Sequence, residues 1–481
     1  MTSVFDLAIV GGGINGTGIA RDAAGRGLSV LLLEQGDLAG ATSSASSKLI
    51  HGGLRYLEYR EFRLVREALT EREVLLRQAP HLIYPLRFIL PYRPGARPWW
   101  MLRAGLFLYD HLGGRRILPA TTARRITDGP LQDDVQRGLE YSDCWVDDAR
   151  LVVTVARDAA DHGADIRTRT KCLAARAEDG LWAVNLAGNI TERAKVLINA
   201  AGPYVSRVLG EVVGEPNPSQ IRMVKGSHIV VPRKGLDDKC YILQNADGRV
   251  CFVIPYQEDF TLIGTTDLDF TGDPASATIT AEEIDYLCAA VNVWFRVPVK
   301  PADVVWSYAG VRPLRDDGTS AAQEATRDYV LELKGSPPVL SVFGGKITTF
   351  RRLAETVVDR LRPLFPGMKP RWTASAPLPG GDFPWDGVAG LSNDLKRRYP
   401  FLTSRTVTRL VRAYGTNAAA VIGEVPGQDL GAGLTTTEVD WMVRREWART
   451  AEDVLWRRSK LGLRFSAAEV SVLEHYLSKS F

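Results

Sequence analysis

Three glycines in the stretch GGGING, at residues 11–16, constrain this chain more than any other feature. Their spacing fits the pattern G-x-G-x-x-G, in which each glycine has its own physical task. Gly11 permits a tight turn at the end of a strand, Gly13 has no Cβ to keep a pyrophosphate from the backbone, and Gly16 lets the next helix pack closely. The pattern predicts a loop that binds the phosphates of a dinucleotide at a helix N-terminus.

The residues around this loop supply the context that the pattern requires. An apolar run at residues 6–10 predicts a strand before the loop, and an Ala-rich stretch up to Arg26 predicts the helix after it. Residues 28–33 are continuously apolar, which is typical of a strand buried in a parallel sheet, and Glu34 ends this run. A carboxylate at that place can accept hydrogen bonds from ribose hydroxyls. We therefore expect a dinucleotide-binding Rossmann unit.

Two further loops favour FAD over NAD as the dinucleotide. A Ser- and Thr-rich loop at residues 41–57 follows the second strand, and its hydroxyls can hydrogen-bond phosphates and ribityl hydroxyls. A late Gly-Gly-Lys turn at residues 344–346 offers a second close backbone approach, suited to the isoalloxazine end. Taken singly, the first loop also fits a flexible surface loop, and the second fits a turn at a helix start. The expected FAD contacts are Gly11, Gly13, Asn15, Gly16, Glu34, Thr42, Ser43, Ser47, Gly52, Gly202, Gly344, Gly345, Lys346 and Thr348.

Separated segments are predicted to assemble into two sheet-containing domains. Short β-rich runs between turn residues, from residue 227 to residue 264, are typical of an antiparallel sheet, whereas residues 194–203 and 339–355 read as further strands and turns of the Rossmann unit. We expect an α/β protein (α+β overall) in which the β-rich part is inserted. The expected ranges are 1–80, 140–215 and 330–365 for the FAD-binding domain, and 81–139 and 216–329 for the substrate domain.

A third unit is expected after the Pro- and Gly-rich stretch at residues 376–387. The pattern beyond it is helical, and Val443, Trp447, Ala451 and Leu455 recur at helical spacing. We predict a separate C-terminal helical domain at residues 376–481.

Composition excludes several other classes of protein. The five cysteines are scattered without a CxxC pair, which indicates reduced thiols in a cytosolic protein and no zinc or other metal site. A net charge of +4 does not suit a general nucleic-acid binder. No apolar run reaches the roughly 18 residues that a transmembrane helix needs. No export signal is visible before the first strand.

Longer motifs extend this interpretation to a known family. After the N-terminal Rossmann stretch, the chain carries, in order, the motifs TSSASSKLIHGGLRYLE, LEYSDCWVDDARL, KGSHIVVP, IGTTD, GVRPL, LSVFGGKITTFRRLAE and LWRRSKLGL. With these motifs the chain resembles the aerobic, FAD-dependent glycerol-3-phosphate dehydrogenases over essentially its whole length. The resemblance implies oxidation of sn-glycerol 3-phosphate to dihydroxyacetone phosphate, with electrons passed to a membrane quinone. It also implies a substrate domain of amino-acid-oxidase type, peripheral association with the inner face of the cytoplasmic membrane, and a homodimer.

A phosphorylated substrate calls for guanidinium and ammonium groups in the pocket. Arg55, Arg312 and Lys346 each stand beside glycine or proline in a loop expected near the flavin, and the matching family positions line the substrate pocket. The alternative for any one arginine is an ordinary ion pair. Tyr56 and Thr265 are expected to hydrogen-bond the substrate, or else simply to pack.

His228 is the candidate base for the C2 hydroxyl proton. It lies in KGSHIVV at the start of an apolar strand, and an unperturbed pKa near 6.5 suits proton removal at neutral pH. A histidine in that position is equally compatible with a structural role. The expected catalytic residues are His228, Arg312 and Lys346, with His228 or a water that it orients taking the proton while hydride passes from C2 to flavin N5.

Residues 93–116 combine Trp, Leu, Phe and Tyr with Arg, which is typical of a segment at a membrane interface. The alternative is an amphipathic helix buried under the substrate domain.

Two alternatives to the function also stay open. One is a glycerol-3-phosphate oxidase that reduces O₂ to peroxide, and the other is a non-catalytic binder of the GDP-dissociation-inhibitor type that has lost flavin, against which the intact glycine motifs argue.

Overall fold

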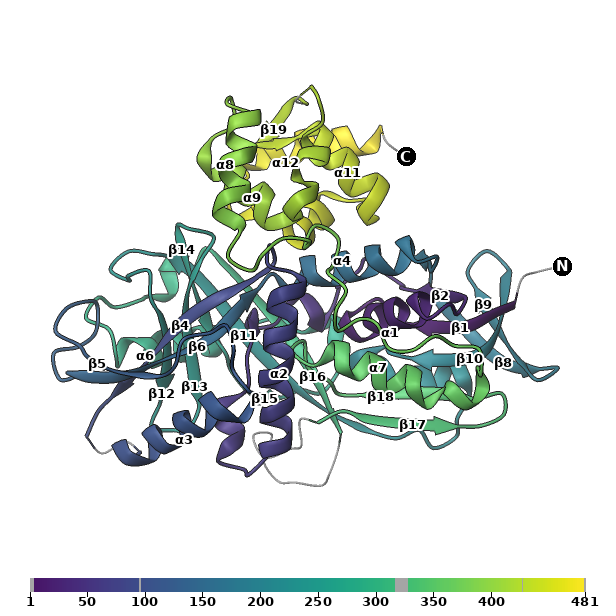
Figure 1. The fold of residues 1–481 in the computed structure, drawn as a ribbon, viewed down its shortest axis with the longest axis horizontal. Helices are drawn as coiled ribbons and strands as arrows, with labels where there is room; N and C mark the ends of the chain where they lie inside the picture. The colour runs from purple at the N-terminus through teal and green to yellow at the C-terminus, as the bar shows by residue number, and fades with distance from the viewer. Residues whose placement is uncertain (1–3, 95–96, 316–327, 426, 480–481) are drawn as a thin grey trace.

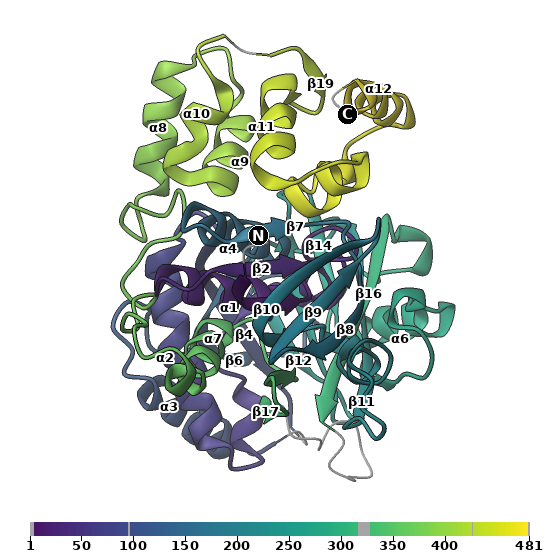
Figure 2. The same ribbon diagram turned by 90° about the vertical axis from the view of Figure 1, so that its right-hand side faces the viewer.

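The computed structural model describes residues 4–94, 97–315, 328–425 and 427–479. Two sheet-containing domains lie side by side, and a smaller helical domain, built from the C-terminal part of the chain, stands over one end of both (Figures 1 and 2). The predicted fold class is confirmed: a Rossmann-like α/β domain, a β-rich second domain and a C-terminal helical domain.

The first sheet carries the glycine loop at the end of its central strand. Strand β1 (Val4–Val10) pairs in parallel with β10 (Ile190–Asn199) on one side and with β2 (Val30–Leu33) on the other. The remaining strands of this sheet are β7 (Asp165–Arg167), β8 (Cys172–Glu178), β9 (Leu181–Leu186), β17 (Val330–Lys334) and β18 (Val339–Phe343). Three separated parts of the chain therefore build one sheet.

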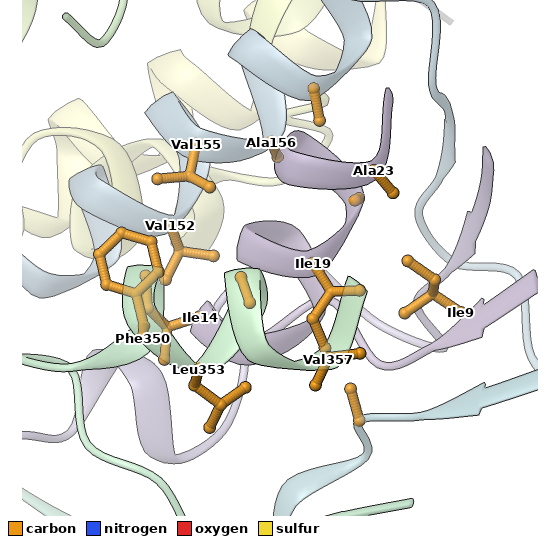
Figure 3. Packing of buried hydrophobic residues seen from close by; sticks show 14 of the residues in the cluster. Ile9, Ile14, Ile19, Ala23, Val152, Val155, Ala156, Phe350, Leu353 and Val357 are labelled. Carbon is orange, nitrogen blue, oxygen red and sulfur yellow. The ribbon is translucent and has the colours of Figure 1, made fainter. Parts of the chain in front are cut away.

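Three helices cover this sheet and fix the direction of the glycine loop. Helix α1 (Ile14–Gly25) lies between α4 (Asp148–Asp161) and α7 (Phe350–Arg360), and they share one buried cluster that includes Ile14, Ile19, Val152, Val155, Phe350 and Leu353 (Figure 3). A Cβ at Gly18 would lie 2.8 Å from the Phe350 ring, so this glycine permits the close approach of α7. The helix that begins at the loop is thus held on two sides.

The second sheet is mostly antiparallel and forms the β-rich domain. Strand β11 (Ile221–Pro232) pairs with β14 (Phe260–Gly264) and with β16 (Trp306–Arg315), which brings three predicted site segments together. The other strands are β3 (Leu49–Ile50), β4 (Ile83–Tyr92), β5 (Thr122–Arg125), β6 (Arg137–Val146), β12 (Cys240–Gln244), β13 (Val250–Tyr256) and β15 (Leu268–Asp269), flanked by α2 (Phe62–Gln78), α3 (Trp99–Leu112) and α6 (Ala281–Asn292).

Strand β6 crosses the domain division that was predicted at residue 140. All of its ten residues pair with β4, from Arg137 to Val146, so the whole strand belongs to the second sheet. Strand β3 joins the same sheet through β6, although it lies inside the range 1–80. The hydrophobic pattern could not place this division, because a strand buried on both faces has the same continuous apolar pattern in either sheet.

The C-terminal domain has a core of its own, formed by α8 (Val388–Arg398), α9 (Ser404–Tyr414), α10 (Ala418–Ile422), α11 (Thr436–Glu446), α12 (Ala467–Ser478) and the hairpin of β19 (Asp429–Gly431) and β20 (Leu434–Thr435). The helical spacing that runs through Trp447 does not mark one helix. Trp447 takes a left-handed φ of 57°, and the Ala448 N–H donates to the Met442 carbonyl at 3.0 Å, which closes α11. A short π-helix, η9 (Asp453–Arg458), follows after a break.

Candidate cofactor and substrate site

The glycine loop leaves no room for side chains at two of its glycines. Gly11 has a φ of +114°, and a Cβ there would lie 2.6 Å from the Ala200 carbonyl oxygen. A Cβ at Gly16 would lie 1.9 Å from the Gly11 carbonyl oxygen, so helix and strand pack backbone against backbone. At Gly13 the nearest atom to such a Cβ is the Ser43 hydroxyl oxygen at 3.1 Å. Gly13 therefore lets the loop backbone lie close against the Ser43 hydroxyl.

Glu34 is tied to this loop by backbone hydrogen bonds. Its carboxylate accepts from the Gly12 N–H at 2.7 Å and from the Gly36 N–H at 2.8 Å. Burial raises the pKa of Glu34 above its ordinary value, while both backbone bonds oppose that rise. A carboxylate accepts about four hydrogen bonds, so acceptor capacity remains for the hydroxyls of a ribose.

A cavity of about 1260 Å³ runs from this loop to the second sheet. Its volume suits a dinucleotide, since typical small-molecule sites measure roughly 300–1,000 Å³. Most predicted site residues line it: Gly11, Gly13, Asn15, Glu34, Thr42, Ser43, Ser47, Tyr56, Gly202, Thr265, Arg312, Gly344, Gly345, Lys346 and Thr348. Four others, Gly16, Gly52, Arg55 and His228, are not among the lining residues.

The hydroxyl-rich loop is anchored on both domains. The Ser43 hydroxyl accepts from the Ile14 N–H at 3.0 Å, and the Thr42 hydroxyl donates to the Val311 carbonyl at 2.6 Å. Ser46 donates to Asp148 at 2.8 Å, and the buried Lys48 ammonium pairs with the same carboxylate at 2.7 Å. These bonds hold the loop in place against the cavity, so it is not the flexible surface loop of the alternative interpretation.

The late glycine turn lines the cavity and contacts the glycine loop through Asn15. Asn15 donates from Nδ2 to the Gly344 carbonyl at 3.1 Å, and a Cβ at Gly345 would lie 2.8 Å from that nitrogen. Asn15 Oδ1 is buried and finds no donor among the described residues. An acceptor that faces a cavity without a donor fits a bound molecule that carries N–H or O–H groups. These features fit FAD.

Two cations line the part of the cavity next to the second sheet. Arg312 on β16 forms an ion pair with Asp267, and its Nη2 donates to the Thr265 hydroxyl at 3.2 Å. The Lys346 ammonium lies 3.7 Å from the centre of the Tyr56 ring, a cation–π contact. Arg55 is the neighbour of Tyr56, and its Nη2 donates to the Tyr59 hydroxyl at 3.4 Å. Of the three predicted cations, the structure brings Arg312 and Lys346 to the cavity wall.

His228 lies one side chain behind the cavity. Its Nε2 is 2.8 Å from the hydroxyl oxygen of Ser47, which does line the cavity, and its ring stacks on Tyr308 at 4.8 Å. Burial, and then the positive charges of Arg312 and Lys48, lower the pKa of His228 well below 6.5. The imidazole is therefore neutral at pH 7, and it is a weaker base than its ordinary pKa suggested.

Sequence reasoning missed a part of the wall. Trp306 and Tyr308 of β16 line the cavity, and so do Trp456 and Lys460 of the C-terminal domain. Aromatic residues in a β-rich stretch carry no signal that separates a wall from a core. The motif LWRRSKLGL, which contributed to the family resemblance, holds the two C-terminal residues.

Comparisons with known proteins match this arrangement. The family described as FAD dependent oxidoreductase matches residues 6–351, and the C-terminal domain of alpha-glycerophosphate oxidase matches residues 371–478. A glycerol-3-phosphate dehydrogenase of Pseudomonas aeruginosa is 53% identical, over 99% of this chain and 96% of that protein. A D-erythritol 1-phosphate dehydrogenase of Brucella abortus is 49% identical, over 96% of each chain.

A solved structure extends the match to three dimensions. The glycerol-3-phosphate dehydrogenase from Bacillus halodurans, complexed with FAD, superposes with a TM-score of 0.77 at 26% identity, over 100% of this chain and 91% of that chain. Together with the family match, it confirms FAD as the cofactor.

Proposed function

Because the chain belongs to the family of FAD-dependent glycerol-3-phosphate dehydrogenases, we propose that it oxidises sn-glycerol 3-phosphate to dihydroxyacetone phosphate and passes the electrons to a membrane quinone. The observation that carries the substrate is the presence of Arg312 and Lys346 on the wall of the cavity that the glycine loop also lines. Two cations bind a phosphate dianion, whereas a neutral alcohol such as glycerol gains nothing from them.

The two cations act by holding the phosphate end of the substrate. Arg312 offers a planar pair of N–H donors, and its bond to the Thr265 hydroxyl fixes the plane of the guanidinium. Lys346 adds a point charge that the Tyr56 ring keeps in place. A substrate held at its phosphate presents C2 in a fixed orientation, which lowers the entropic part of the barrier. Bound FAD supplies the redox chemistry, by accepting the hydride of C2 at flavin N5.

We assign removal of the C2 hydroxyl proton to His228, acting through Ser47. The 2.8 Å contact between Nε2 and the Ser47 hydroxyl connects the ring to the cavity. The ring is neutral at pH 7, because its pKa lies well below 6.5, so it is in the form that accepts a proton.

The substrate assignment is tested by anaerobic bleaching of the bound flavin. We expect sn-glycerol 3-phosphate to bleach the visible flavin absorbance at low concentration, and glycerol and lactate to leave it unchanged. D-Erythritol 1-phosphate is the necessary fourth arm, because a relative that is 49% identical to this chain carries that substrate in its name. Bleaching by glycerol as efficient as that by its phosphate would overturn the proposed role of the two cations.

The electron acceptor has a second candidate, O₂. The match of residues 371–478 to a domain of alpha-glycerophosphate oxidase favours it, and the same substrate pocket serves both reactions. We propose the quinone. The decisive measurement compares the peroxide yield with the reduction of a short-chain quinone analogue under air. A stoichiometric peroxide yield in the presence of the analogue would establish the oxidase instead.

We propose that the outer face of α3 contacts the inner face of the cell membrane. The inward face of this helix is buried through Leu106 and Tyr109, whereas Trp100 is 71% exposed and Phe107 is 62% exposed. No helix in the described ranges is long and apolar enough to cross a bilayer. Aromatic side chains on an exposed helix face, with the exposed Arg103 among them, suit the headgroup region of anionic lipids.

Liposome co-sedimentation tests this contact with a matched control. We expect the double variant Trp100→Ser, Phe107→Ser to lose most of its binding to anionic vesicles. Phe401→Ser is the control, because Phe401 is 57% exposed but belongs to the C-terminal domain. Full binding by the double variant would remove α3 from the proposal.

A further inference from the structure

The C-terminal domain supplies part of the wall of the cofactor cavity. Glu452, Trp456, Arg457 and Lys460 line the cavity, and they come from the π-helix η9 and the residues on either side of it. Three of these four side chains are charged. The domain therefore does more than pack against the outside of the other two.

Asp37 is the point at which this domain holds the cofactor-binding part of the chain. It lies three residues after Glu34 and is buried. Arg458, which is fully buried, donates to its two carboxylate oxygens at 2.6 Å and 2.8 Å, and Arg457 donates from Nε at 2.6 Å. A buried carboxylate needs such partners, since desolvation otherwise destabilises its charge. Docking of the C-terminal domain thus satisfies a charge next to the ribose-binding residue.

The segment that contains Asp37 is held from its other side by the glycine loop and the first sheet. The Ala39 N–H donates to the Gly12 carbonyl at 3.2 Å, and the Arg169 N–H donates to the Gly36 carbonyl at 2.8 Å. Arg169 also pairs with Asp453 of η9. The segment from Glu34 to Ala39 therefore lies between the glycine loop and η9, and movement of either one is transmitted to it.

A second contact lies further along the cavity. Trp456 stacks on Trp306 of β16, with ring centres 4.4 Å apart and planes at 19°. Lys460 is buried and is attracted by Asp148, the carboxylate that accepts the Ser46 hydroxyl. Burial lowers the pKa of Lys460 to about 8, so it is mostly cationic at pH 7. Arg457 lines the same side of the cavity, but its guanidinium is paired with Asp37, Glu452 and Asp453, so Lys460 is the cation of this segment that can face an anionic ligand.

We propose that residues 452–460 of the C-terminal domain form part of the FAD site and close over its adenosine diphosphate half. Lys460 adds positive charge towards the diphosphate, and the Arg457–Asp37 and Arg458–Asp37 pairs hold the segment in place. Cofactor binding and docking of the C-terminal domain are then coupled, and the coupling is reciprocal. This inference rests on the FAD site alone and is independent of the substrate and of the electron acceptor.

The first test measures FAD release from the purified full-length holoenzyme by the rise in free-flavin fluorescence. We expect Arg457→Gln and Lys460→Met each to raise the dissociation constant for FAD by about tenfold or more. Arg405→Gln is the matched control, because it removes an ion pair between the same domain and Asp259 of the β13–β14 hairpin, away from the cavity. The control should change the constant less than about twofold. Unchanged FAD binding in both cavity variants would overturn the proposal.

The second test needs no variant and therefore does not depend on correct folding of a mutant. Backbone hydrogen exchange is compared between the wild-type apoprotein and the same protein reconstituted with FAD. We expect slower exchange at residues 449–460 on binding, because a closed segment opens less often. Equal exchange rates of that segment in both forms would contradict the coupling, even if exchange at the glycine loop slows.

Discussion

The two ends of the cavity are built from different kinds of atoms. At the cofactor end, the decisive atoms belong to the backbone: Gly11 and Gly16 leave no room for a Cβ, and Glu34 is bound to two backbone N–H groups. At the proposed substrate end the corresponding atoms belong to long side chains. Arg312 and Lys346 contact Asp267 and Tyr56, respectively.

This difference determines which changes each end tolerates. A site made of backbone atoms is sensitive to added volume and indifferent to charge, because its donors cannot be replaced but can be blocked. A site made of charged side chains is sensitive to loss of charge, because the neighbouring carboxylate is left without its partner. Variants at the two ends should therefore change different quantities, one the affinity for FAD and the other the kinetics with substrate.

The largest effect is expected for Arg312→Ala. Removing one partner of a charged, hydrogen-bonded pair costs roughly 2–5 kcal/mol, so kcat/KM should fall by about 30- to 5000-fold, mostly through KM. FAD should stay bound, since Arg312 is absent from the glycine-loop contacts. The measurement is steady-state kinetics with sn-glycerol 3-phosphate, combined with the flavin content of the purified protein.

A double variant separates the two causes of this loss, which are the missing attraction of Arg312 for the phosphate and the repulsion of the phosphate by Asp267. Arg312→Ala leaves the Asp267 carboxylate near the phosphate, so Arg312→Ala, Asp267→Asn should recover part of the activity by removing that repulsion. Arg222 lies on the neighbouring strand β11, and Arg222→Ala removes only its surface ion pair with Asp269 of β15, so this control should leave KM unchanged. Loss of FAD from Arg312→Ala would erase the distinction between the two ends.

A smaller effect is expected for Gly16→Ala, and it should appear in the affinity for FAD instead of in KM. The new Cβ would lie 1.9 Å from the Gly11 carbonyl oxygen, so the helix must move away from the loop. Overpacking of this kind costs roughly 1–3 kcal/mol, which corresponds to FAD binding about 5- to 150-fold weaker. Gly105→Ala is the control, because no atom lies within 4 Å of a Cβ at that helical position. FAD titration of the apoproteins measures both, and a KM effect at saturating FAD would contradict the comparison.

The same difference explains how much could be predicted from the sequence. The cofactor end was predictable, because Gly11, Gly16 and Glu34 act through local backbone geometry within one β–loop–α–β unit. The wall formed by Tyr308 and Lys460 was not, because their contacts depend on the packing of distant segments. Trp447 shows the limit of periodicity: its spacing continues a helix that its left-handed backbone ends.

The substrate end is also where pH should act. Burial and the charges of Arg312 and Lys48 lower the pKa of His228 well below 6.5, so the neutral ring persists as the pH falls through 6.5. The acidic limb of kcat/KM should therefore lie well below pH 6.5. His228→Gln should abolish the limb. A limb centred near pH 6.5 that survives in this variant would assign it to another group.

The lowered pKa of His228 also makes the stability of the fold depend on pH. A histidine whose pKa is lowered in the folded state stabilises the fold fully above the unfolded pKa near 6.5. This stability is lost as the pH falls through the folded pKa, because the unfolded chain takes up the proton more readily. Thermal unfolding of the wild type should show a fall of Tm below about pH 6.5 that is weaker in His228→Gln.

The smallest effect is expected for Ser43→Ala, at the boundary between the two kinds of recognition. Ser43 is a side chain, but its hydroxyl accepts the Ile14 N–H at 3.0 Å and thus orders the start of the helix. Losing one neutral hydrogen bond costs roughly 0.5–1.5 kcal/mol, so FAD binding should weaken by about two- to tenfold. KM at saturating FAD should not change. If KM rises while FAD affinity stays constant, the hydroxyl-rich loop belongs functionally to the substrate end, and the boundary between the two ends must be drawn at the glycine loop itself.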